Sequence, residues 1–500
     1  NDFYFTIFFL IKYIGIPGFL LYLTCWLWEI RCVRMKDHSC PLPLPGGNMG
    51  FPLVGEMFHL FVVGANYQRQ RRRKYGKIYR THMFGSPSVA VIGDEYVKKI
   101  VLGEGTLVQT RWPSTTRRIL GTDGIVNGDL ATHCRIKRLA LKAFSPKYVG
   151  TFAPVIQAGI AAHIKEWLGR GTVPILEMCK QAVSKTMMTV LLGIKSDDPN
   201  IQLYIQAADD IINSILSLPL DIPGFGFRRG LKARELIFDK LETQLKSKFN
   251  ASDEELFGDN GGEYESVLLN ILKLARREGE TDIKLRNLQN LSLEFIFAGT
   301  QSLQCSCSLV TFHLSQNPKV VERCREEIRT AGLWDIPLTE INVERLQGLK
   351  YVEMVAKETL RVTPTIPGAV RVALKTFELG GYQIPRGWQI IYSIRLTHEE
   401  AAGKYFDCSC DSDDSKSTKT APPKHTCSKQ NSPYSFLPFG KGARMCAGKN
   451  YGMLYLKVLI FELVRNADIS LVGKCKIVEV PMTRTDKSVK IKLTPLRKPS

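Results

Sequence analysis

The sequence has no disulfide framework, no visible internal repeat and fewer acidic than basic side chains. Its 13 cysteines are scattered without regular spacing, and their odd number argues against a disulfide scaffold and for a reducing, cytosolic environment. The 68 basic residues outnumber 48 acidic ones, for a formal net charge of +20. Such a charge predicts an acidic partner: nucleic acid, an anionic membrane face or an acidic protein surface. Because no segment resembles a nucleic-acid-binding motif, we interpret the charge as favouring a membrane.

One long apolar segment lies near the start of the chain. Residues 3–28 are rich in Phe, Leu, Ile, Tyr and Trp, and Arg31, Arg34 and Lys36 follow directly. An apolar span with a basic flank predicts a single membrane anchor with a cytosolic catalytic domain. No small-residue cleavage site follows, so we expect no cleaved signal peptide; a buried core helix is the alternative. Because residue 1 is Asn and not Met, we expect a few residues to precede it.

The 500 residues, 44% of them hydrophobic, suffice for one large catalytic domain or two ordinary ones. We expect a membrane anchor over 1–33, a basic and Pro-rich hinge over 34–47, and a catalytic domain over 48–500. Residues 407–433 form a low-complexity segment that we expect to be a disordered insertion. Its cysteines and His425 could instead be zinc ligands, but their spacing fits no closed site.

The segment from Phe439 to Gly448 has the composition of a loop that presents one thiolate, that of Cys446. A thiolate that ligates a metal needs a lowered pKa, which nearby positive charge or backbone N–H groups can provide. Glycine at 440, 442 and 448 permits a tight backbone path, in part with positive φ, that turns such N–H groups toward the sulfur. A buried structural cysteine is the alternative.

Residues on both sides of this cysteine support the same interpretation. The planar fork of Arg444 could reach a carboxylate of a bound cofactor. The apolar periodicity over 451–466 predicts a helix whose N-terminus faces the sulfur and favours negative charge there.

Several helices and strands are predicted elsewhere. The longest helix is expected over 285–316, where Gly299 and a hydroxyl residue in mid-helix predict a local bulge with room for a small ligand and water. Glu358 and Arg361 place opposite charges on one helix face, a weak signal by itself. Two basic helices are also predicted, one over 67–75 near a bilayer and one from His133 to Phe144 that is able to bind cofactor carboxylates. The remaining predictions are strands over 77–92, helices over 154–168 and 180–192, and a surface loop over 251–265.

These motifs together resemble the cytochrome P450 superfamily. The pattern Phe-x-x-Gly-x-Arg-x-Cys-x-Gly over 439–448 matches the superfamily's haem-ligand loop at every specified position, and the Glu358–Arg361 pair and the Ala298-Gly299 helix occur in the superfamily's order. The chain more closely resembles the retinoic acid hydroxylase family. The segments that carry this closer resemblance are 371–379, 381–385, 111–113, 119–121, 217–219 and 221–223.

The resemblance implies a mainly α fold with small β-sheets, a haem-thiolate fold with an N-terminal transmembrane anchor. It implies a catalytic domain on the cytosolic side of the endoplasmic reticulum, binding haem b and receiving electrons from NADPH-cytochrome P450 reductase. The substrate would be a small lipophilic acid, retinoic acid, which the enzyme would hydroxylate with O2.

The resemblance also assigns roles to individual residues. Cys446 would be the axial ligand, whose thiolate donates electron density to the iron. Arg444, Arg371, His133 and Lys137 match positions that hold haem propionates, and Phe439, Gly442 and Gly448 belong to the ligand loop. Glu358 and Arg361 would be structural, behind the haem. The chemistry would involve Gly299, Gln301 and Ser302, and the substrate pocket Trp112, Leu216, Phe297, Thr365 and Ile366.

The chain also departs from the superfamily pattern. Gln301 and Ser302 replace the usual acid and Thr; an amide cannot relay protons as a carboxylate does, although Ser302 can still hold a water. The Phe-x-Pro-x-Arg-Phe segment that usually supplies a third partner to the Glu–Arg pair is absent. Ser86 and Ala90 lie where vertebrate relatives tend to carry arginine. These departures keep two alternatives open: a haem-thiolate isomerase of lipid peroxides, and a degenerate haem- or retinoid-binding protein.

Overall fold

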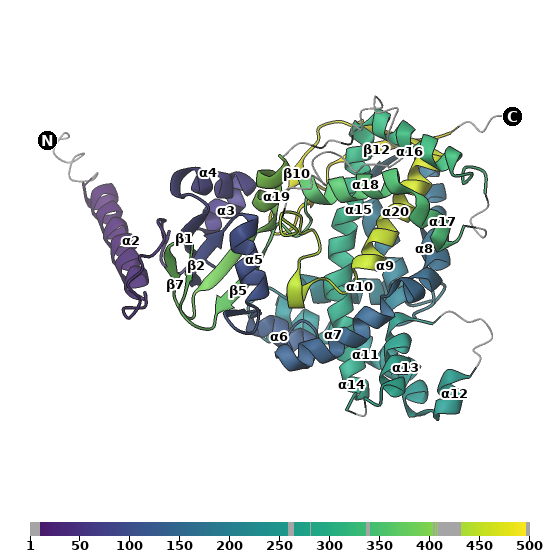
Figure 1. Cartoon of the computed structure of the whole chain (residues 1–500), viewed down its shortest axis with the longest axis horizontal. Coiled ribbons are helices and arrows are strands. Elements are labelled where there is room, and N and C mark those ends of the chain that lie inside the picture. Colours follow the sequence, from purple (N-terminus) through teal and green to yellow (C-terminus); the bar gives the residue numbers. More distant parts are fainter. Residues whose placement is uncertain are drawn as a thin grey trace.

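The structure is a computed structural model that describes residues 11–258, 265–280, 282–336, 341–403, 406, 408 and 432–496. Figure 1 shows a mainly helical molecule, in which a small sheet with its helices occupies the left part and a larger body of helices the right part. The predicted fold class, mainly α with small sheets, is confirmed.

The largest sheet has five strands in the order β1-β2-β8-β5-β3. β1 and β2 pair antiparallel and confirm the strands predicted over 77–92, whereas β2 and β8 are parallel. Val89, Val91 and Ile390 are fully buried and pack in one cluster with α5. The strands are β1 (Ile78–Met83), β2 (Ser86–Val91), β3 (Val108–Gln109), β5 (Gly368–Ala373) and β8 (Gln389–Ser393).

Short elements surround this sheet. A hairpin of two antiparallel strands follows β5, and three helices precede or follow β1 and β2. They are α3 (Met57–Val63), α4 (Ala65–Tyr75), α5 (Asp94–Leu102), β6 (Phe377–Leu379) and β7 (Tyr382–Ile384).

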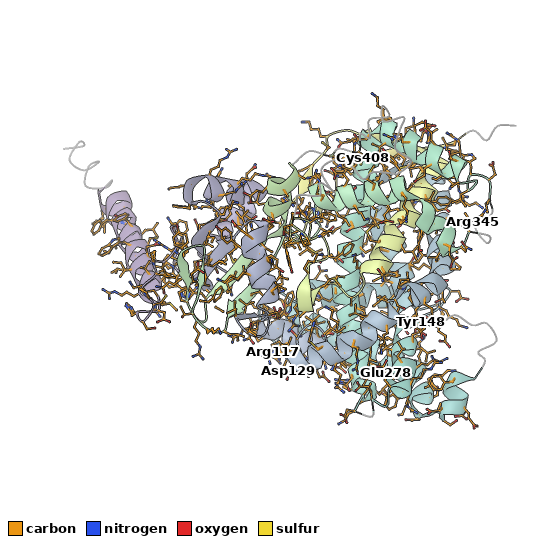
Figure 2. The ribbon with its side chains drawn as sticks, in the orientation of Figure 1. Arg117, Asp129, Tyr148, Glu278, Arg345 and Cys408 are labelled. Atoms are coloured by element: carbon orange, nitrogen blue, oxygen red, sulfur yellow. The ribbon has the colours of Figure 1, made fainter. Side chains whose placement is uncertain are left out.

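A run of helices leads into the larger body. Asp129 caps the helix that bears His133, since its carboxylate accepts from the Thr132 N–H at 2.8 Å; Asp129 lies at the lower edge of Figure 2. The helices are α6 (Ser114–Leu120), α7 (Leu130–Ala143), α8 (Pro146–Arg170), α9 (Ile175–Met187) with a π-helical end at Met188–Leu192, α10 (Ile201–Ser214), α11 (Gly226–Asn250), α12 (Asp253–Phe257) and α13 (Val267–Arg277).

The predicted long helix and its bulge are both present. The segment α14 (Leu285–Phe295) continues through a π-helical turn at Ile296–Thr300 into α15 (Gln301–Gln316). The π-turn contains Gly299, the residue from which the bulge was predicted. Most side chains of α15 are buried, so this helix forms the centre of the body.

The C-terminal part completes the core. The helix predicted over 451–466 is confirmed as α20, which packs against α8 and α18 through fully buried residues such as Tyr455 and Phe461. The helices are α16 (Pro318–Thr330), α17 (Val343–Gly348), α18 (Lys350–Val362), α19 (Ile394–Ala402) and α20 (Lys449–Asn466). One sheet contains β4 (Thr172–Pro174), β12 (Lys490–Pro495) and β9 (Ala467–Val472), and another contains β10 (Ile477–Val478) and β11 (Arg484–Thr485).

The N-terminal helix is the element most separate from the body. Helix α2 (Ile16–Arg34), preceded by a π-helical turn at Ile11–Gly15, projects at the left of Figure 1. Within the described residues it alone is long and apolar enough to cross a membrane. Most of its side chains are exposed, as expected of a membrane anchor and not of a buried core helix.

The last turns of α2 nevertheless contact the sheet. Glu29 pairs with Arg80 of β1 at 2.9 Å and accepts from the Met49 N–H at 2.8 Å. The Trp28 ring lies edge-on to His82, with centroids 5.1 Å apart, and Cys32 is buried. The segment after the helix is tied to β7, because Gln383 donates to the Cys40 carbonyl at 3.3 Å and its backbone N–H to the Pro43 carbonyl at 3.0 Å.

Three sequence predictions need correction. Helix α8 begins at Pro146, so Pro154 lies inside it and does not start it; Pro146 takes the first-turn position that suits proline, and Phe152 and Ala153 are buried in the core. The predicted surface loop over 251–265 contains helix α12, because Ser252 and Glu255 form a capping box.

The third correction concerns α4, predicted as an exposed basic face near a bilayer. Arg69, Arg71 and Arg72 instead pair with the carboxylates of Glu399, Glu56 and Glu400. Glu56 is buried and also accepts from the Tyr67 hydroxyl at 2.6 Å. Most of the charge of this helix is therefore neutralised within the protein.

The predicted insertion over 407–433 lies almost wholly outside the described residues. Cys408, which lies within it, is described and buried near the top of Figure 2, and its carbonyl accepts from the Tyr351 hydroxyl at 3.1 Å.

Candidate functional site

The loop that bears Cys446 closes on itself through backbone hydrogen bonds. The Cys446 N–H donates to the Phe439 carbonyl at 2.9 Å, and a 3-10 turn spans Gly442–Arg444. Gly440 and Gly442 have φ of 66° and 67°, values that favour glycine. A Cβ at Gly442 would lie 2.9 Å from the Val101 side chain and 3.0 Å from its carbonyl oxygen, so no larger residue fits there.

Gly448 behaves differently from the other two glycines. Its φ is −85°, and a Cβ there would meet no atom within 4 Å, so the positive φ of this loop is confined to Gly440 and Gly442. The Gly448 N–H does point toward the sulfur and lowers the pKa of the Cys446 thiol. Because the Cys446 N–H is used by Phe439, the donor to the sulfur comes from the start of α20.

Cys446 combines an accessible side chain with a desolvated environment. Its side chain is accessible to solvent, yet burial within the protein raises the pKa of its thiol, opposed by the Gly448 N–H and by the charges of Lys137 and Lys449. An accessible thiol that is also desolvated borders an interior space. The same positive groups favour the thiolate over the thiol when a metal binds.

The π-turn of the long helix presents accessible residues among buried ones. Ala298 is exposed and Phe297 and Gly299 are half-buried, whereas Ile296 and Thr300, on either side, are buried. An exposed alanine in the middle of the central helix indicates a hollow beside it. The half-buried Ser302 donates its hydroxyl to the Ala298 carbonyl at 2.6 Å, which leaves its oxygen free to accept from a water.

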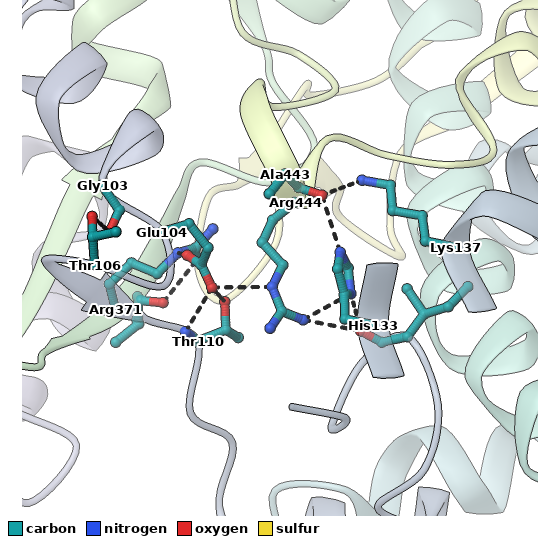
Figure 3. Close-up of polar contacts among 11 residues, drawn as sticks. Gly103, Glu104, Thr106, Thr110, His133, Lys137, Arg371, Ala443 and Arg444 are labelled. Atoms are coloured by element: carbon teal, nitrogen blue, oxygen red, sulfur yellow. Dashed lines mark hydrogen bonds and ion pairs between the residues drawn. The ribbon is translucent and has the colours of Figure 1, made fainter. Parts of the chain in front are cut away.

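Two arginines and a glutamate lie beside the Cys446 loop (Figure 3). Glu104 Oε2 contacts Arg371 Nε at 2.7 Å, and Glu104 Oε1 contacts Arg444 Nε at 3.0 Å. Arg371 comes from β5 and Arg444 from the cysteine loop, so one carboxylate orients two cations from distant parts of the chain.

His133 and Lys137 lie on the opposite side of Arg444, on one face of α7. Both contact the Ala443 carbonyl, His133 Nε2 at 3.0 Å and Lys137 Nζ at 2.5 Å. Burial lowers the pKa of both side chains. The lowered pKa favours the neutral imidazole of His133, whose Nδ1 lies 2.7 Å from the Ile125 carbonyl oxygen and 2.9 Å from Arg444 Nη1. The turn thus places a polar and a cationic side chain, His133 and Lys137, on one face of α7, as the sequence predicts.

These residues fit a haem. Arg371, Arg444 and Lys137 carry three positive charges against the single charge of Glu104, and this excess suits a group with two carboxylates. The thiol of Cys446 and the bulge at Ala298 supply a soft metal ligand and an accessible helix face. The Cys446 thiol, the three cations and the accessible Ala298 thus match what an iron porphyrin requires.

Glu358 and Arg361 form a fully buried bidentate pair. Arg361 donates to the two carboxylate oxygens at 2.8 and 2.7 Å, and to the Gly403 carbonyl at 2.5 Å. His398 connects this pair to the cysteine loop, since its Nδ1 lies 3.1 Å from the Arg361 carbonyl and its Nε2 accepts from the Leu437 N–H at 2.7 Å. The pair therefore supports the segment that enters the Cys446 loop.

The expected substrate residues are only partly brought together. Trp112 lies edge-on to Phe297, with centroids 5.5 Å apart. Ile366 is 41% exposed, but Thr365 is buried and its hydroxyl is 2.7 Å from that of Ser306. Leu216 is 66% exposed on the loop after α10, so its own surroundings do not place it in a closed chamber.

Sequence reasoning missed Glu104, Glu294 and His398. Glu104 lies between two glycines without a recognisable motif, and its partners are hundreds of residues away. Glu294, buried at the end of α14, was detectable only as a carboxylate in an otherwise apolar helix face. His398 has no local signal either.

Comparison with known proteins gives a consistent result. Residues 45–493 match the family model described as Cytochrome P450. The chain is 36% identical over 465 residues to cytochrome P450 26A1 of Gallus gallus, covering 92% of this chain and 91% of that protein. It is 33% identical over 482 residues to cytochrome P450 26B1 of Xenopus tropicalis, covering 95% and 91%. The solved retinoic acid-bound cyanobacterial CYP120A1 superposes with a TM-score of 0.78 at 24% identity, covering 91% of this chain and all of that one.

Proposed function

The chain belongs to the cytochrome P450 family, and from that premise we propose that it hydroxylates retinoic acid. As a member it is a haem-dependent monooxygenase. When bound, the haem activates O2 so that one oxygen atom enters a C–H bond of the substrate. The second oxygen atom leaves as water, which consumes two electrons and two protons.

The observation that carries the proposal is that the Cys446 thiol and Ala298, in the middle of the central helix, are both accessible. The accessible thiol and the exposed Ala298 provide an iron ligand and an open helix face. In this proposal Arg371, Arg444 and Lys137 bind the two haem carboxylates, with His133 as a neutral partner of Arg444. Phe439 and Gly442 maintain the loop, and Gly448 donates to the sulfur.

Protons would reach the reaction through Ser302. Its hydroxyl can hold a water while it donates to the Ala298 carbonyl. The adjacent Gln301 can orient that water through its amide but cannot release a proton. Proton delivery therefore depends on water held by Ser302, with Gly299 leaving room for it.

Support for retinoic acid comes from the sequence. The segments resembling retinoic acid hydroxylases are spread over most of the domain, and the solved cyanobacterial protein of the same fold has retinoic acid bound. Trp112, Phe297 and Ile366 provide the apolar contacts that a polyene requires; Leu216 and Thr365 belong to the same proposed pocket wall.

We also propose the cellular setting. The apolar α2 is compatible with membrane anchoring, and the proposed divisions are an anchor over 1–33, a hinge over 34–47 and a catalytic domain over 48–500. The chain would lie on the endoplasmic reticulum with its domain in the cytosol, where NADPH-cytochrome P450 reductase supplies electrons.

The test is a reconstituted assay with the reductase, NADPH and retinoic acid. Wild type should consume retinoic acid and give hydroxylated product, and Cys446→Ala should not. Wild type no more active than Cys446→Ala would contradict the proposal.

Gln301 and Ser302 favour a second candidate, a haem-thiolate isomerase of lipid peroxides, because that reaction needs no external proton delivery. Turnover of a lipid peroxide without reductase and NADPH would favour the isomerase. Haem binding without the thiolate band of the reduced carbon monoxide complex would indicate a degenerate binding protein.

A further inference from the structure

Glu294 is a buried carboxylate outside the set of residues assigned above. It is 2% exposed and lies on α14, two residues before the π-turn at Ile296–Thr300. Its Oε2 accepts from the Ile125 N–H at 2.7 Å and its Oε1 from the Val126 N–H at 2.9 Å. Both oxygens are thus directed at two successive backbone groups of one loop.

The loop is shaped to this carboxylate. A Cβ at Gly124 would lie 2.4 to 2.5 Å from the carboxylate atoms of Glu294, so only glycine permits this approach. One turn earlier on α14, Asn290 donates to the Asp123 carboxylate at 2.7 Å. The helix therefore holds the loop before α7 at two points.

The other side of the same peptide faces the proposed haem cradle. The Ile125 carbonyl accepts from Arg444 Nη1 at 3.1 Å, while Arg444 Nε contacts Glu104 at 3.0 Å. Arg444 is thus oriented by one carboxylate directly and by Glu294 through a single residue, Ile125.

We propose that Glu294 is a positioning residue for the cofactor cradle: by binding two N–H groups of the loop it fixes the Ile125 carbonyl that orients Arg444. The inference rests on the proposed function, because it assumes that Arg444 binds a haem carboxylate. Glu294 contacts no cofactor atom in this scheme and acts only through the loop.

Packing alone does not account for a carboxylate here. An apolar side chain would fill the position without the cost of burying an acid. Two N–H groups with no other strong acceptor, however, need both oxygens. Glutamine keeps the volume but presents an NH2 group to one N–H, so it breaks one of the two hydrogen bonds without leaving a cavity.

The test compares full-length wild type with Glu294→Gln and a matched control, Glu462→Gln. Glu462 is also a buried helical carboxylate, 1% exposed, but its partners Arg465 and Asn466 lie at the end of α20. The readout is the rate of haem transfer to excess apomyoglobin, which requires no catalysis. Glu294→Gln should lose haem about tenfold faster than wild type, and Glu462→Gln within about twofold of it.

A double variant separates positioning from general destabilisation. If Glu294 acts through Arg444, the Glu294→Gln, Arg444→Gln double variant should lose haem no faster than Arg444→Gln alone. An unchanged rate in Glu294→Gln, or effects that multiply in the double variant, would overturn the inference while leaving the proposed function intact. Wild type without haem would overturn both.

Should Glu294→Gln fail to fold, Gly124→Ala is the second variant. The added methyl group on the loop displaces the Glu294 carboxylate, and the rate of haem transfer to apomyoglobin should also increase about tenfold. An unchanged rate in that variant would equally overturn the inference.

Discussion

Glu294 and His398 are buried ionisable side chains whose pKa values shift in opposite directions. Burial raises the pKa of Glu294 from 4.5 to about 7, despite the backbone N–H groups that lower it. Burial lowers the pKa of His398 from 6.5 to about 4. His398 is therefore neutral at pH 7, as its role requires, since its Nε2 must accept from Leu437 while Nδ1 donates to Arg361.

The raised pKa of Glu294 predicts a stability difference that depends on pH. The folded protein holds the proton of this carboxyl group more tightly than the unfolded chain does. The resulting stabilisation of the folded protein is fully present below about pH 4.5 and is lost as the pH rises to about 7. Glutamine does not titrate. The free energy of unfolding of Glu294→Gln minus that of wild type should therefore increase by about 2 kcal/mol from about pH 5.5 to about pH 7.5.

Denaturant titrations at the two pH values measure this difference. The groups facing Glu294 are the Asp123 carboxylate and the N–H groups of Ile125, Val126 and Asn127, and N–H groups do not titrate. Asp123→Asn therefore serves as the control for the neighbouring carboxylate. A difference independent of pH would contradict the raised pKa of Glu294.

Removal of the His398 ring should weaken the cysteine loop. In His398→Ala the buried Leu437 N–H and Arg361 carbonyl lose their partners, at a cost of about 3 kcal/mol in unfolding free energy. Because Leu437 enters the loop, a larger fraction of the reduced carbon monoxide complex should lack the thiolate band. His163→Ala, a histidine change on α8, should leave that fraction unchanged; equal spectra for the two variants would argue against the connection.

At the scale of elements, α4 is part of the protein core and not a free basic surface. Arg71→Ala would leave the Glu56 carboxylate, 4% exposed, with only the hydroxyls of Tyr67 and Thr81. Loss of the cation should decrease the free energy of unfolding by about 3 to 5 kcal/mol. Arg73 is an exposed neighbour, and Arg73→Ala should change the free energy of unfolding by less than about 0.5 kcal/mol.

Chemical denaturation of the two variants checks this prediction. Similar small losses for both would show that α4 is a solvated charge run.

The elements differ in how far the sequence determines them. The bulge at Gly299, the start of α20 after Gly448 and the β1–β2 pair follow from local composition and periodicity, and all were predictable. The pairing of Arg71 with Glu56 and of Glu104 with Arg371 and Arg444 was not. These contacts join different elements, 15 positions apart for Arg71 and Glu56 and 340 for Arg444 and Glu104, and periodicity carries no information about which surfaces meet.

At the scale of the whole molecule, the apolar N-terminal helix α2 is joined to the catalytic body by specific contacts. A chain starting at residue 25 keeps Trp28, Glu29 and Cys32, whereas one starting at residue 35 leaves Arg80 and the Met49 N–H without Glu29. The longer chain should be more stable by about 2 kcal/mol. Thermal unfolding of both chains in the same detergent measures this, and equal midpoints would show that the contacts contribute nothing.

Glu29 contacts β1, and the segment at Pro43 contacts β7. These contacts restrict rotation of the catalytic body relative to α2. A helix in a bilayer tilts to match the local hydrocarbon thickness. With both sides of the junction held, any such tilt would turn the catalytic body by the same angle. Membranes of different thickness would then present different parts of its surface, such as the exposed loop of Leu216, to the lipid from which the proposed substrate would enter.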